Sequence, residues 1–407
     1  MTAAPARSRD PRDAPGAVPV LLLIVFLSLI GFGVVIPLLP FFATVFEAEA
    51  WQVTLLFATF SAGQFLGELF WGRLSDRIGR RPVLLITIFA SALGYLALAF
   101  SPNIWIAIAA RGAAGFFSGN MSTIQGYVVD VTPPERLAGR LGLIGSAFGV
   151  GFVVGPAIGG LLARPELGAA GFRPPLELAA GLCVLAGIGV LVFVRESRLG
   201  PRPPGIRRNP LAAITESLGH PVLATLLGCT FVSFAAFSAM WAVLGLWGEV
   251  RFGWGPRDIG LVMALTGVAA ALSQGVLSGI FVRRIGPGVT IALGLSLTAI
   301  CLMIQAISPW PWLVVVCMVL GVAGHASTQP AVTSLVSRSA TPDRQGATLG
   351  ASTAVGSLAR VAGPIIAGVL FSSVGPSAPI VFSALGLIPA AWLGWRAARL
   401  LHVGRDP

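Results

Sequence analysis

Glu68, Arg111 and His325 are ionisable side chains that lie inside long apolar stretches of this 407-residue chain. A charge is costly in such surroundings. An arginine at the centre of a bilayer costs at least about 2.5 kcal/mol, so a buried one is a functional candidate. A carboxyl group can carry a proton, and an imidazole titrates near neutrality. We interpret the three as proton-coupling candidates, with two alternatives: Glu68 could support the charged segment that follows it, and His325 could be a hydrogen-bonded packing residue.

A stripe of polar and small residues continues from the arginine along the same apolar run. Its members recur at steps of four and three residues, which places them on one face of a helix. They are Arg111, Gly115, Ser118, Ser122 and Gln125. We expect this face to line a cavity, and the alternative is that it makes helix–helix hydrogen bonds.

Other side chains near these candidates could form the walls of the same cavity. Some are polar residues one helical turn from an ionisable group, and two are aromatic residues that suit bulky planar ligands. An aromatic stripe is also typical of packing or lipid contact. The cavity-lining candidates are Ser28, Gln64, Ser118, Ser122, Gln125, Phe237, Trp241, Gln329 and Arg360.

Arg360 is the second arginine inside an apolar run. Together with Arg111 it would leave the cavity net positive, which favours neutral or anionic amphiphilic ligands. The alternative is that Glu68 or backbone carbonyl groups satisfy both arginines.

The composition places all these residues in a membrane. Hydrophobic residues make up 55% of the chain and the mean hydropathy is +0.86, well above soluble proteins. Apolar runs of about 20 residues or more, enough to cross a bilayer, recur along the whole chain. They are 18–41, 51–71, 82–101, 103–125, 138–163, 175–194, 219–247, 257–281, 288–308, 311–333, 346–372 and 376–398. We predict an all-α membrane protein of about twelve transmembrane helices.

The arginines are unevenly distributed between the loops. The chain has no lysine, and most arginines fall in segments on the side of both chain ends. The opposite loops carry only Arg164, Arg173, Arg251 and Arg257. By the positive-inside rule both termini are cytoplasmic, in a multi-pass protein of a bacterial inner or plasma membrane. The net charge of +11 therefore reflects topology and not nucleic-acid binding, which needs a contiguous basic face.

The two halves of the chain repeat each other at an offset of about 208 residues. Pro134-Glu135-Arg136 corresponds to Pro342-Asp343-Arg344, and Gly155-Pro156 corresponds to Gly363-Pro364. An even number of spans separates the copies, so the repeats are parallel and could rock about a central binding site. We predict two pseudo-symmetric six-helix bundles. The predicted segments are a disordered cytoplasmic N-terminus (1–17), the bundles (18–194 and 219–400), a cytoplasmic linker (195–218) and a cytoplasmic tail (401–407).

The segment Gly72–Pro82, between the second and third spans, is densely charged and must lie in water. The residues that stand out in it are Gly72, Asp76, Arg77, Gly79, Arg80 and Arg81. The second copy has Arg283 in place of Asp76, and likewise Leu320 in place of Arg111. We therefore expect the two halves to differ in function.

Glycines and a proline recur in the fifth span. Glycines let neighbouring helices approach closely, and a proline removes a backbone donor and bends the helix. We interpret this motif as a hinge between the halves on the outer side. Its residues are Gly145, Gly149, Gly155, Pro156, Gly159 and Gly160.

These motifs resemble the major facilitator superfamily, and in particular its twelve-span drug:proton antiporters close to the tetracycline-efflux-like members. The resemblance rests on Gly72–Pro82, on Gly31–Pro40, on Arg111-Gly112-x-x-Gly115 and on the glycine–proline motif of the fifth span. It implies the two-bundle fold and alternating access. The fifth-span motif resembles antiporters in particular, which favours export over uptake.

The resemblance also implies how the charged segment acts. Asp76 would sit against the N-terminus of the helix near Gln345, where free N–H groups and the helix dipole favour an anion. It would form a one-sided latch on the inner gate. The resemblance thus makes gating candidates of Gly72, Asp76, Arg77, Gly79, Arg80 and Arg81. The arginines of the segment would pair with carboxylates of nearby inside loops, such as Glu135 or Asp343; at least one arginine could instead be a topology anchor.

The chain departs from the family pattern in its first span. Many relatives carry an acidic residue three positions before the Gly-x-Gly, where this chain has Ser28. This departure leaves the usual proton carrier open and favours a facilitator or symporter of sugars or organic acids as the alternative function. A non-transporting membrane sensor is the alternative of another class, but it would normally need a soluble signalling domain.

We therefore predict a secondary-active exporter of small amphipathic compounds, working by alternating access in exchange for protons. Its partners would be a small-molecule substrate, protons and the lipid bilayer, and it would function as a monomer. The four cysteines all fall in apolar runs and behave as small hydrophobic residues. We expect no metal, no cofactor and no enzymatic activity.

Overall fold

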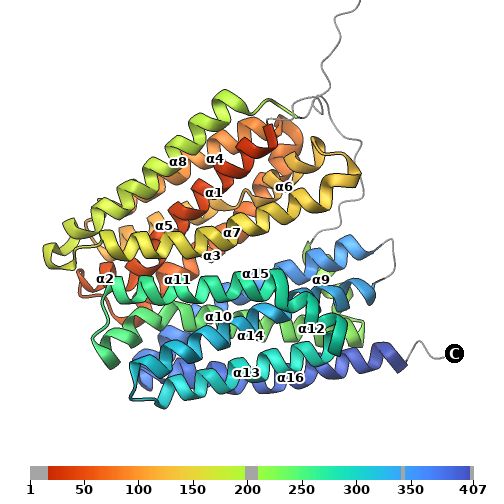
Figure 1. Cartoon of the computed structure of the whole chain (residues 1–407). Coiled ribbons are helices and arrows are strands. Elements are labelled where there is room, and N and C mark those ends of the chain that lie inside the picture. The colour runs from red at the N-terminus through yellow and green to blue at the C-terminus, as the bar shows by residue number, and fades with distance from the viewer. Residues whose placement is uncertain (1–16, 198–209, 341–343, 404–407) are drawn as a thin grey trace, which may run out of the picture.

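The computed structural model of the chain describes residues 17–197, 210–340 and 344–403 (Figure 1). Over these ranges the secondary structure is helical, without strands. Eleven helices are long and apolar enough to cross a membrane. The predicted N-terminal segment, much of the predicted linker, the end of the tail and Asp343 lie outside the described residues.

The helices follow one another with short connections. They are α1 (Ala17–Val35), η2 (Ile36–Leu38), α2 (Leu39–Thr44), α3 (Ala50–Ile78), α4 (Arg80–Ala99), α5 (Ile104–Ser118), α6 (Met121–Asp130), α7 (Pro134–Leu162), η3 (Pro165–Phe172), α8 (Arg173–Phe193), α9 (Pro210–Leu218), α10 (Pro221–Phe252), α11 (Pro256–Leu272), η4 (Ser273–Leu277), α12 (Ser278–Ile285), α13 (Pro287–Ile307), α14 (Pro311–Arg338), α15 (Gln345–Ser373) and α16 (Ala378–Val403).

The predicted span 103–125 is divided into two helices, neither of which is long enough to count as a span alone. Helix α5 ends at Ser118, and α6 begins only after Gly119 and Asn120. The backbone of Asn120 is non-helical, and its side-chain amide donates to Thr87 Oγ1 at 2.8 Å. Gly119 and Asn120 both have weak helix propensity. The break explains why eleven long helices are found where twelve spans were predicted.

Two equivalent turns link helices in the two halves. Gly79 (φ 105°, ψ 160°) joins α3 to α4, and Gly286 (φ 80°, ψ 160°) joins α12 to α13. A positive φ strains any residue with a side chain, so glycine is required at both turns. We call the end of the molecule that carries these turns the hairpin end, and the opposite end the distal end.

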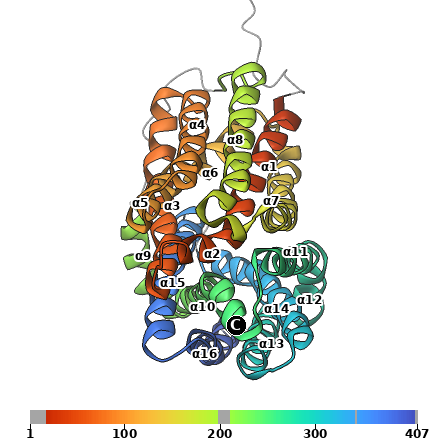
Figure 2. The same cartoon turned by 90° about the vertical axis from the view of Figure 1, so that its left-hand side faces the viewer.

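The helices form two groups, α1–α8 and α10–α16, which lie against each other (Figures 1 and 2). The groups meet through α3 with α15 and through α7 with α11. In Figure 1 they diverge towards the right, where the C-terminus lies. This arrangement is the two-bundle architecture of an all-α membrane protein.

The two groups are in backbone contact at the distal end. A Cβ atom on Gly160 of α7 would collide with the Pro256 carbonyl oxygen and would lie 3.2 Å from the Cα of Gly260 on α11. On the other side of the molecule, Gly368 of α15 packs against Trp51 and Thr54 of α3 in the same way. The distal end is therefore closed.

The hairpin end is open between the same helices. Atoms built as Cβ on Gly142 and Gly145 of α7, or on Gly346 and Gly350 of α15, would meet nothing within 4 Å. The two groups thus touch at one end and separate at the other. Any space between them is reached from the hairpin end.

The distal contact gives a first prediction. Gly160→Ala should lower the melting temperature of the purified protein, because overpacking against a backbone that cannot move aside costs about 1–3 kcal/mol. The matched control is Gly145→Ala in the same helix. Its methyl group meets open space, so it should gain the helix preference of alanine, about 0.5–1 kcal/mol. Equal melting temperatures for the two variants would contradict the distal contact.

Candidate functional site

A cavity of about 1000 Å³ lies between the two helix groups. Side chains from α1, α3, α4 and α7 line one wall, and side chains from α10, α11, α14 and α15 line the other. The volume is at the upper end of the range for small-molecule sites, about 300–1000 Å³. Most of the lining is apolar, with a few polar groups. The cavity can therefore enclose a drug-sized amphipathic molecule.

Seven of the nine predicted cavity-lining residues line this cavity, together with two of the three proton-coupling candidates and two residues of the predicted hinge. The lining includes Ser28, Gln64, Glu68, Ser118, Gly145, Gly149, Phe237, Trp241, His325, Gln329 and Arg360. They come from both halves and from positions far apart in the chain.

The polar stripe predicted along the fourth span was expected to line the cavity. This expectation is wrong for most of the stripe. Of its five members only Ser118 is in the lining. Gly115 packs against the Phe60 carbonyl of α3, and Ser122 packs against Gly72 of the same helix. The break after α5 also ends the regular spacing on which the stripe was based. Gln125 is exposed.

Arg111 lies behind the cavity wall. It is only 2% exposed, and its guanidinium carbon is 4.2 Å from the centre of the Phe60 ring. Its Nε and Nη1 atoms have no hydrogen-bond partner among the described residues. Tyr95, which does line the cavity, lies within electrostatic reach of the guanidinium. A direct contact of Arg111 with a ligand would require the wall to move.

Glu68 and Arg360 place opposite charges in one cavity. Glu68 comes from α3 and Arg360 from α15, so each half contributes one member, and the two groups interact electrostatically. The guanidinium also donates from Nη2 to Ser357 Oγ at 2.9 Å and lies 5.4 Å from the Phe234 ring centre. The expected net positive cavity is therefore corrected: Arg111 is outside it, and Glu68 balances Arg360.

His325 is built into the aromatic wall of the C-terminal half. Its ring stacks on Phe237, with centres 4.2 Å apart and planes at 8°, and meets the edge of Phe234. Its Nδ1 atom is 3.3 Å from Ser233 Oγ. The residue is 4% exposed. Its orientation is fixed by these contacts.

One lining residue that was not predicted is Asn120. It lies at the break in the fourth span, where its amide reaches Thr87 of α4. A glycine–asparagine pair inside an apolar run is a recognisable break signal. That signal could have identified both the break and the residue.

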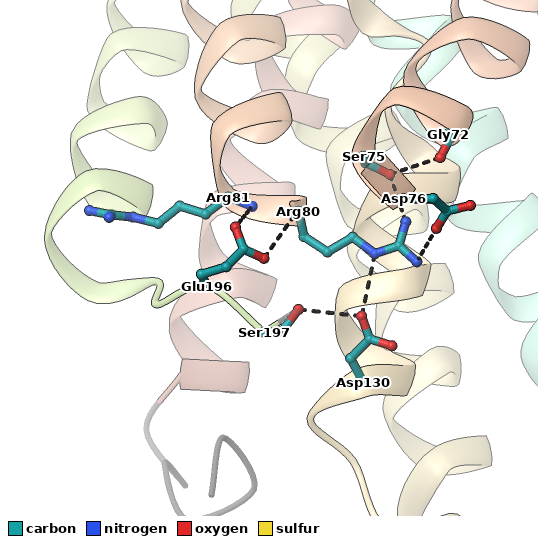
Figure 3. A network of polar contacts seen from close by, with 8 residues as sticks. All are labelled: Gly72, Ser75, Asp76, Arg80, Arg81, Asp130, Glu196 and Ser197. Atoms are coloured by element: carbon teal, nitrogen blue, oxygen red, sulfur yellow. Dashed lines mark hydrogen bonds and ion pairs between the residues drawn. The ribbon is translucent and has the colours of Figure 1, made fainter. Parts of the chain in front are cut away.

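Arg80 is the centre of a polar network at the hairpin end (Figure 3). Its guanidinium contacts Asp76 at 2.9 Å, Asp130 at 3.3 Å and Ser75 Oγ at 2.6 Å. Its backbone N–H donates to Glu196 at 2.9 Å. The network joins α3, α4, α6 and the end of α8 within one half.

The other arginines of the hairpin differ in their contacts. Arg81 donates from its backbone to Glu196 at 3.1 Å and from Nη2 to the Leu191 carbonyl at 2.6 Å. Glu196 thus occupies the N-terminus of α4, where the helix dipole favours an anion. Arg77 is exposed, without a hydrogen bond or ion pair in the described part of the chain. The carboxylates found beside these arginines are Asp130 and Glu196, and not the expected Glu135.

The residues of the predicted hinge in α7 contact two different helices, α1 and α11. Gly155 and Gly159 pack against Gly33 and Val34 of α1, in the same half. Gly160 instead touches α11 of the other half, as described above. Pro156 lies inside α7, which remains one helix.

The network predicts a large difference between two neighbouring arginines. Arg80→Gln should destabilise the protein by about 3 kcal/mol, because it removes the cation that contacts the half-buried Asp76 and Asp130 carboxylates. Arg77→Gln, which removes the same charge from an exposed position, should change stability little. Chemical unfolding of both purified variants would measure the difference. Similar losses would show that the network does not stabilise the fold.

Comparisons with known proteins agree with this architecture. The family model of the Major Facilitator Superfamily matches residues 21–364 and 226–404. The chain is 32% identical to the class C tetracycline resistance protein of Escherichia coli, covering 88% of this chain and 90% of that one. It is 27% identical to the quinolone resistance protein NorA of Staphylococcus aureus (strain MRSA252), covering 90% and 92%.

Among solved structures, the fold matches a bacterial homologue of the human lysosomal transporter Spinster in an inward-facing and occupied conformation. The TM-score is 0.79 at 16% identity, over 96% of this chain and 98% of that one. The resemblance predicted from the sequence motifs is confirmed. The chain belongs to the Major Facilitator Superfamily and is a membrane transporter.

Proposed function

We propose that the protein exports small amphipathic compounds from the cytoplasm by alternating access, in exchange for protons. The observation that carries this proposal is the cavity between the halves, with Glu68 on one wall and Arg360 on the other. A site formed by two repeats that can rock against each other is what alternating access needs. One chain supplies both walls, which supports a functional monomer.

Two arguments support export as the direction of transport: the orientation of the protein in the membrane and the names of similar proteins. The arginine-rich hairpin end is assigned to the cytoplasm by the positive-inside rule, with both termini there, in a bacterial inner membrane. The open side of the cavity then faces the cytoplasm, where an exporter loads its substrate. The relatives include tetracycline, quinolone and multidrug resistance proteins, which supports drug-like compounds as the substrate class.

The charge pair supports proton exchange. A carboxylate facing a guanidinium across the interface attracts the two walls, and protonation of Glu68 removes that attraction and leaves Arg360 unbalanced. A polar substrate could likewise replace one member of the pair. Binding of a proton and binding of a substrate would then both use the Glu68–Arg360 pair, so one would exclude the other. Such mutual exclusion is the requirement for exchange. His325 and Arg111 remain further candidates for the proton path.

The hairpin and the fifth span would control the gates. In the conformation described, Asp76 pairs with Arg80 within its own half. When the hairpin end closes, Asp76 would approach the N-terminus of α15 as the predicted latch. At the other end, separation of Gly160 from α11 would open the cavity outwards. Gly145 and Gly149, which line the cavity, would then approach the opposite half.

The central residue of this proposal can be tested with tetracycline as the probe. Proteoliposomes with an imposed pH gradient should accumulate tetracycline with the wild-type protein, and Glu68→Gln should abolish the dependence on the gradient because a neutral amide cannot carry the proton. Glu249→Gln, an exposed acidic residue of α10 outside the cavity, is the matched control and should behave as wild type. Flux of the wild type that ignores the gradient would contradict antiport.

The pair itself can be tested by a double-mutant cycle. Glu68→Gln and Arg360→Gln should each reduce gradient-driven flux, and the double variant should lose less than the two losses added. Residues that interact directly typically couple by about 0.5–3 kcal/mol. Initial rates of tetracycline flux for the four proteins give the coupling. Strictly additive losses would show that the two residues act separately.

A further inference from the structure

Glu68 and Arg360 face each other across the large cavity without touching. The two groups interact electrostatically, but their charged atoms are too far apart to form an ion pair in the conformation described. The Glu68 carboxylate has no hydrogen-bond partner among the described residues, and the guanidinium of Arg360 has one, Ser357. Both side chains are half-buried and line the cavity. The gap between these opposite charges is therefore open to a ligand.

The two side chains lean towards each other along the membrane normal. Helices α3 and α15 touch at the distal end, where Gly368 packs against Thr54. By the rise of an α-helix, Arg360 lies about 12 Å from this contact and Glu68 lies about 21 Å from it. Side chains in a helix tilt towards its N-terminus, so Glu68 of α3 tilts inwards and Arg360 of α15 tilts towards the opening. The tilts bring the two charged groups towards the same depth of the cavity.

An aromatic wall begins at Arg360 and continues deeper into the cavity. The guanidinium carbon lies 5.4 Å from the centre of the Phe234 ring, and this ring meets His325 edge-on. His325 stacks on Phe237, whose ring centre is 5.7 Å from that of Trp241. All four residues of the aromatic wall line the cavity. Helix α10 runs towards the distal end, so Trp241 lies about 10 Å deeper than Phe234.

The charge of a ligand decides how many charges of the cavity it can compensate. The lining is mostly apolar, and within the described ranges its charged residues are Glu68 and Arg360. A ligand that displaces water from both groups must replace their hydration, because an uncompensated charge in such surroundings is costly. An anion would compensate only Arg360, a cation only Glu68, and a neutral molecule neither. A molecule that carries both charges compensates both groups at once.

We propose that the cavity binds zwitterionic aromatic amphiphiles. The anionic group of the ligand lies at Arg360, its cationic group lies at Glu68, and its planar body lies against the aromatic wall. The inference rests on the proposed function and names the substrate class. Because the cationic group occupies the Glu68 carboxylate, a bound substrate and a proton on Glu68 exclude each other.

A series of fluorescent probes separates the charge classes. Nα-dansyl-lysine carries a planar dansyl group, a carboxylate and an ammonium group at the end of a flexible chain. Its amide is a cation, its Nε-acetyl derivative is an anion, and the Nε-acetyl amide is neutral. The ammonium group keeps its charge at about pH 7.5, because the pKa of a lysine side chain is about 10.4.

Binding of these probes to the wild-type protein is the first test. The protein in lipid nanodiscs is titrated with each probe and followed by dansyl fluorescence, with empty nanodiscs as the background. The zwitterion should bind about tenfold more tightly than each of the other probes, because it alone forms charge-assisted hydrogen bonds with both residues. This ranking needs no variant, so it stays measurable whichever substitutions fold.

Substitutions of the two residues should change the ranking in opposite directions. Arg360→Gln should weaken binding of the zwitterion and the anion by about tenfold, and the cation should bind at least as tightly as before because Glu68 is then unbalanced. Glu68→Gln should weaken binding of the zwitterion and the cation and spare the anion. Arg360→Lys keeps the charge and should keep the zwitterion as the preferred probe.

The matched controls remove the same charges outside the cavity. Glu249→Gln and Arg251→Gln change exposed residues near the distal end of α10 and should keep the wild-type ranking. Two results would each overturn the proposal. One is a singly charged or neutral probe that binds the wild type as tightly as the zwitterion does. The other is an equal loss of all the probes in both Arg360→Gln and Glu68→Gln.

Equilibrium binding needs neither a gradient nor transport, so its result is independent of the proposed exchange. If the zwitterion is preferred but wild-type tetracycline flux ignores the pH gradient, the antiport fails and the substrate class stands. If flux depends on the gradient and all the probes bind alike, the substrate class fails and the antiport stands.

Discussion

Backbone contact at the distal end determines how the two halves are arranged. Gly160 meets Gly260 backbone to backbone, and Gly368 packs against the backbone of Trp51 and the side chain of Thr54. The two groups touch at this end, and the same helices are separated at the hairpin end. The large cavity and its opening at the hairpin end follow from this contact.

Opposite charges are brought together in two different ways in this chain. At the hairpin end, Arg80 is held among Asp76 and Asp130 inside one half, so the network stiffens that half. In the cavity, Glu68 and Arg360 belong to different halves, so their attraction depends on the conformation. The network around Arg80 is suited to keep its half rigid. The pair of Glu68 and Arg360 is suited to respond to protons or substrate.

The fold could be predicted from the sequence because hydropathy, arginine placement and the internal repeat all depend on the bilayer. Several cavity residues, such as Glu68 and Gln329, could also be predicted, since polar groups in a span rarely face lipid. Helical spacing gives a common face but not its direction, and for this reason Arg111 and Ser122 were expected in the cavity and lie elsewhere. The break at Asn120 changed that direction within a single span.

The spacing of residues along the sequence could not predict contacts between residues from distant parts of the chain. Glu196 caps α4 because α8 ends beside it, and Gln305 is buried because α13 packs on α14 and α16. Neither residue stands out in the sequence. The roles of both residues depend on tertiary packing, which leaves no local pattern in the sequence.

The central claim is that the halves move between a hairpin-open and a hairpin-closed arrangement. The most direct test is the distance between spin labels at Gly142→Cys of α7 and Gly350→Cys of α15, two open positions at the hairpin end. Double electron–electron resonance in nanodiscs should show a long and a short distance, whose ratio changes with pH and with tetracycline. A single distance that neither condition changes would contradict the account.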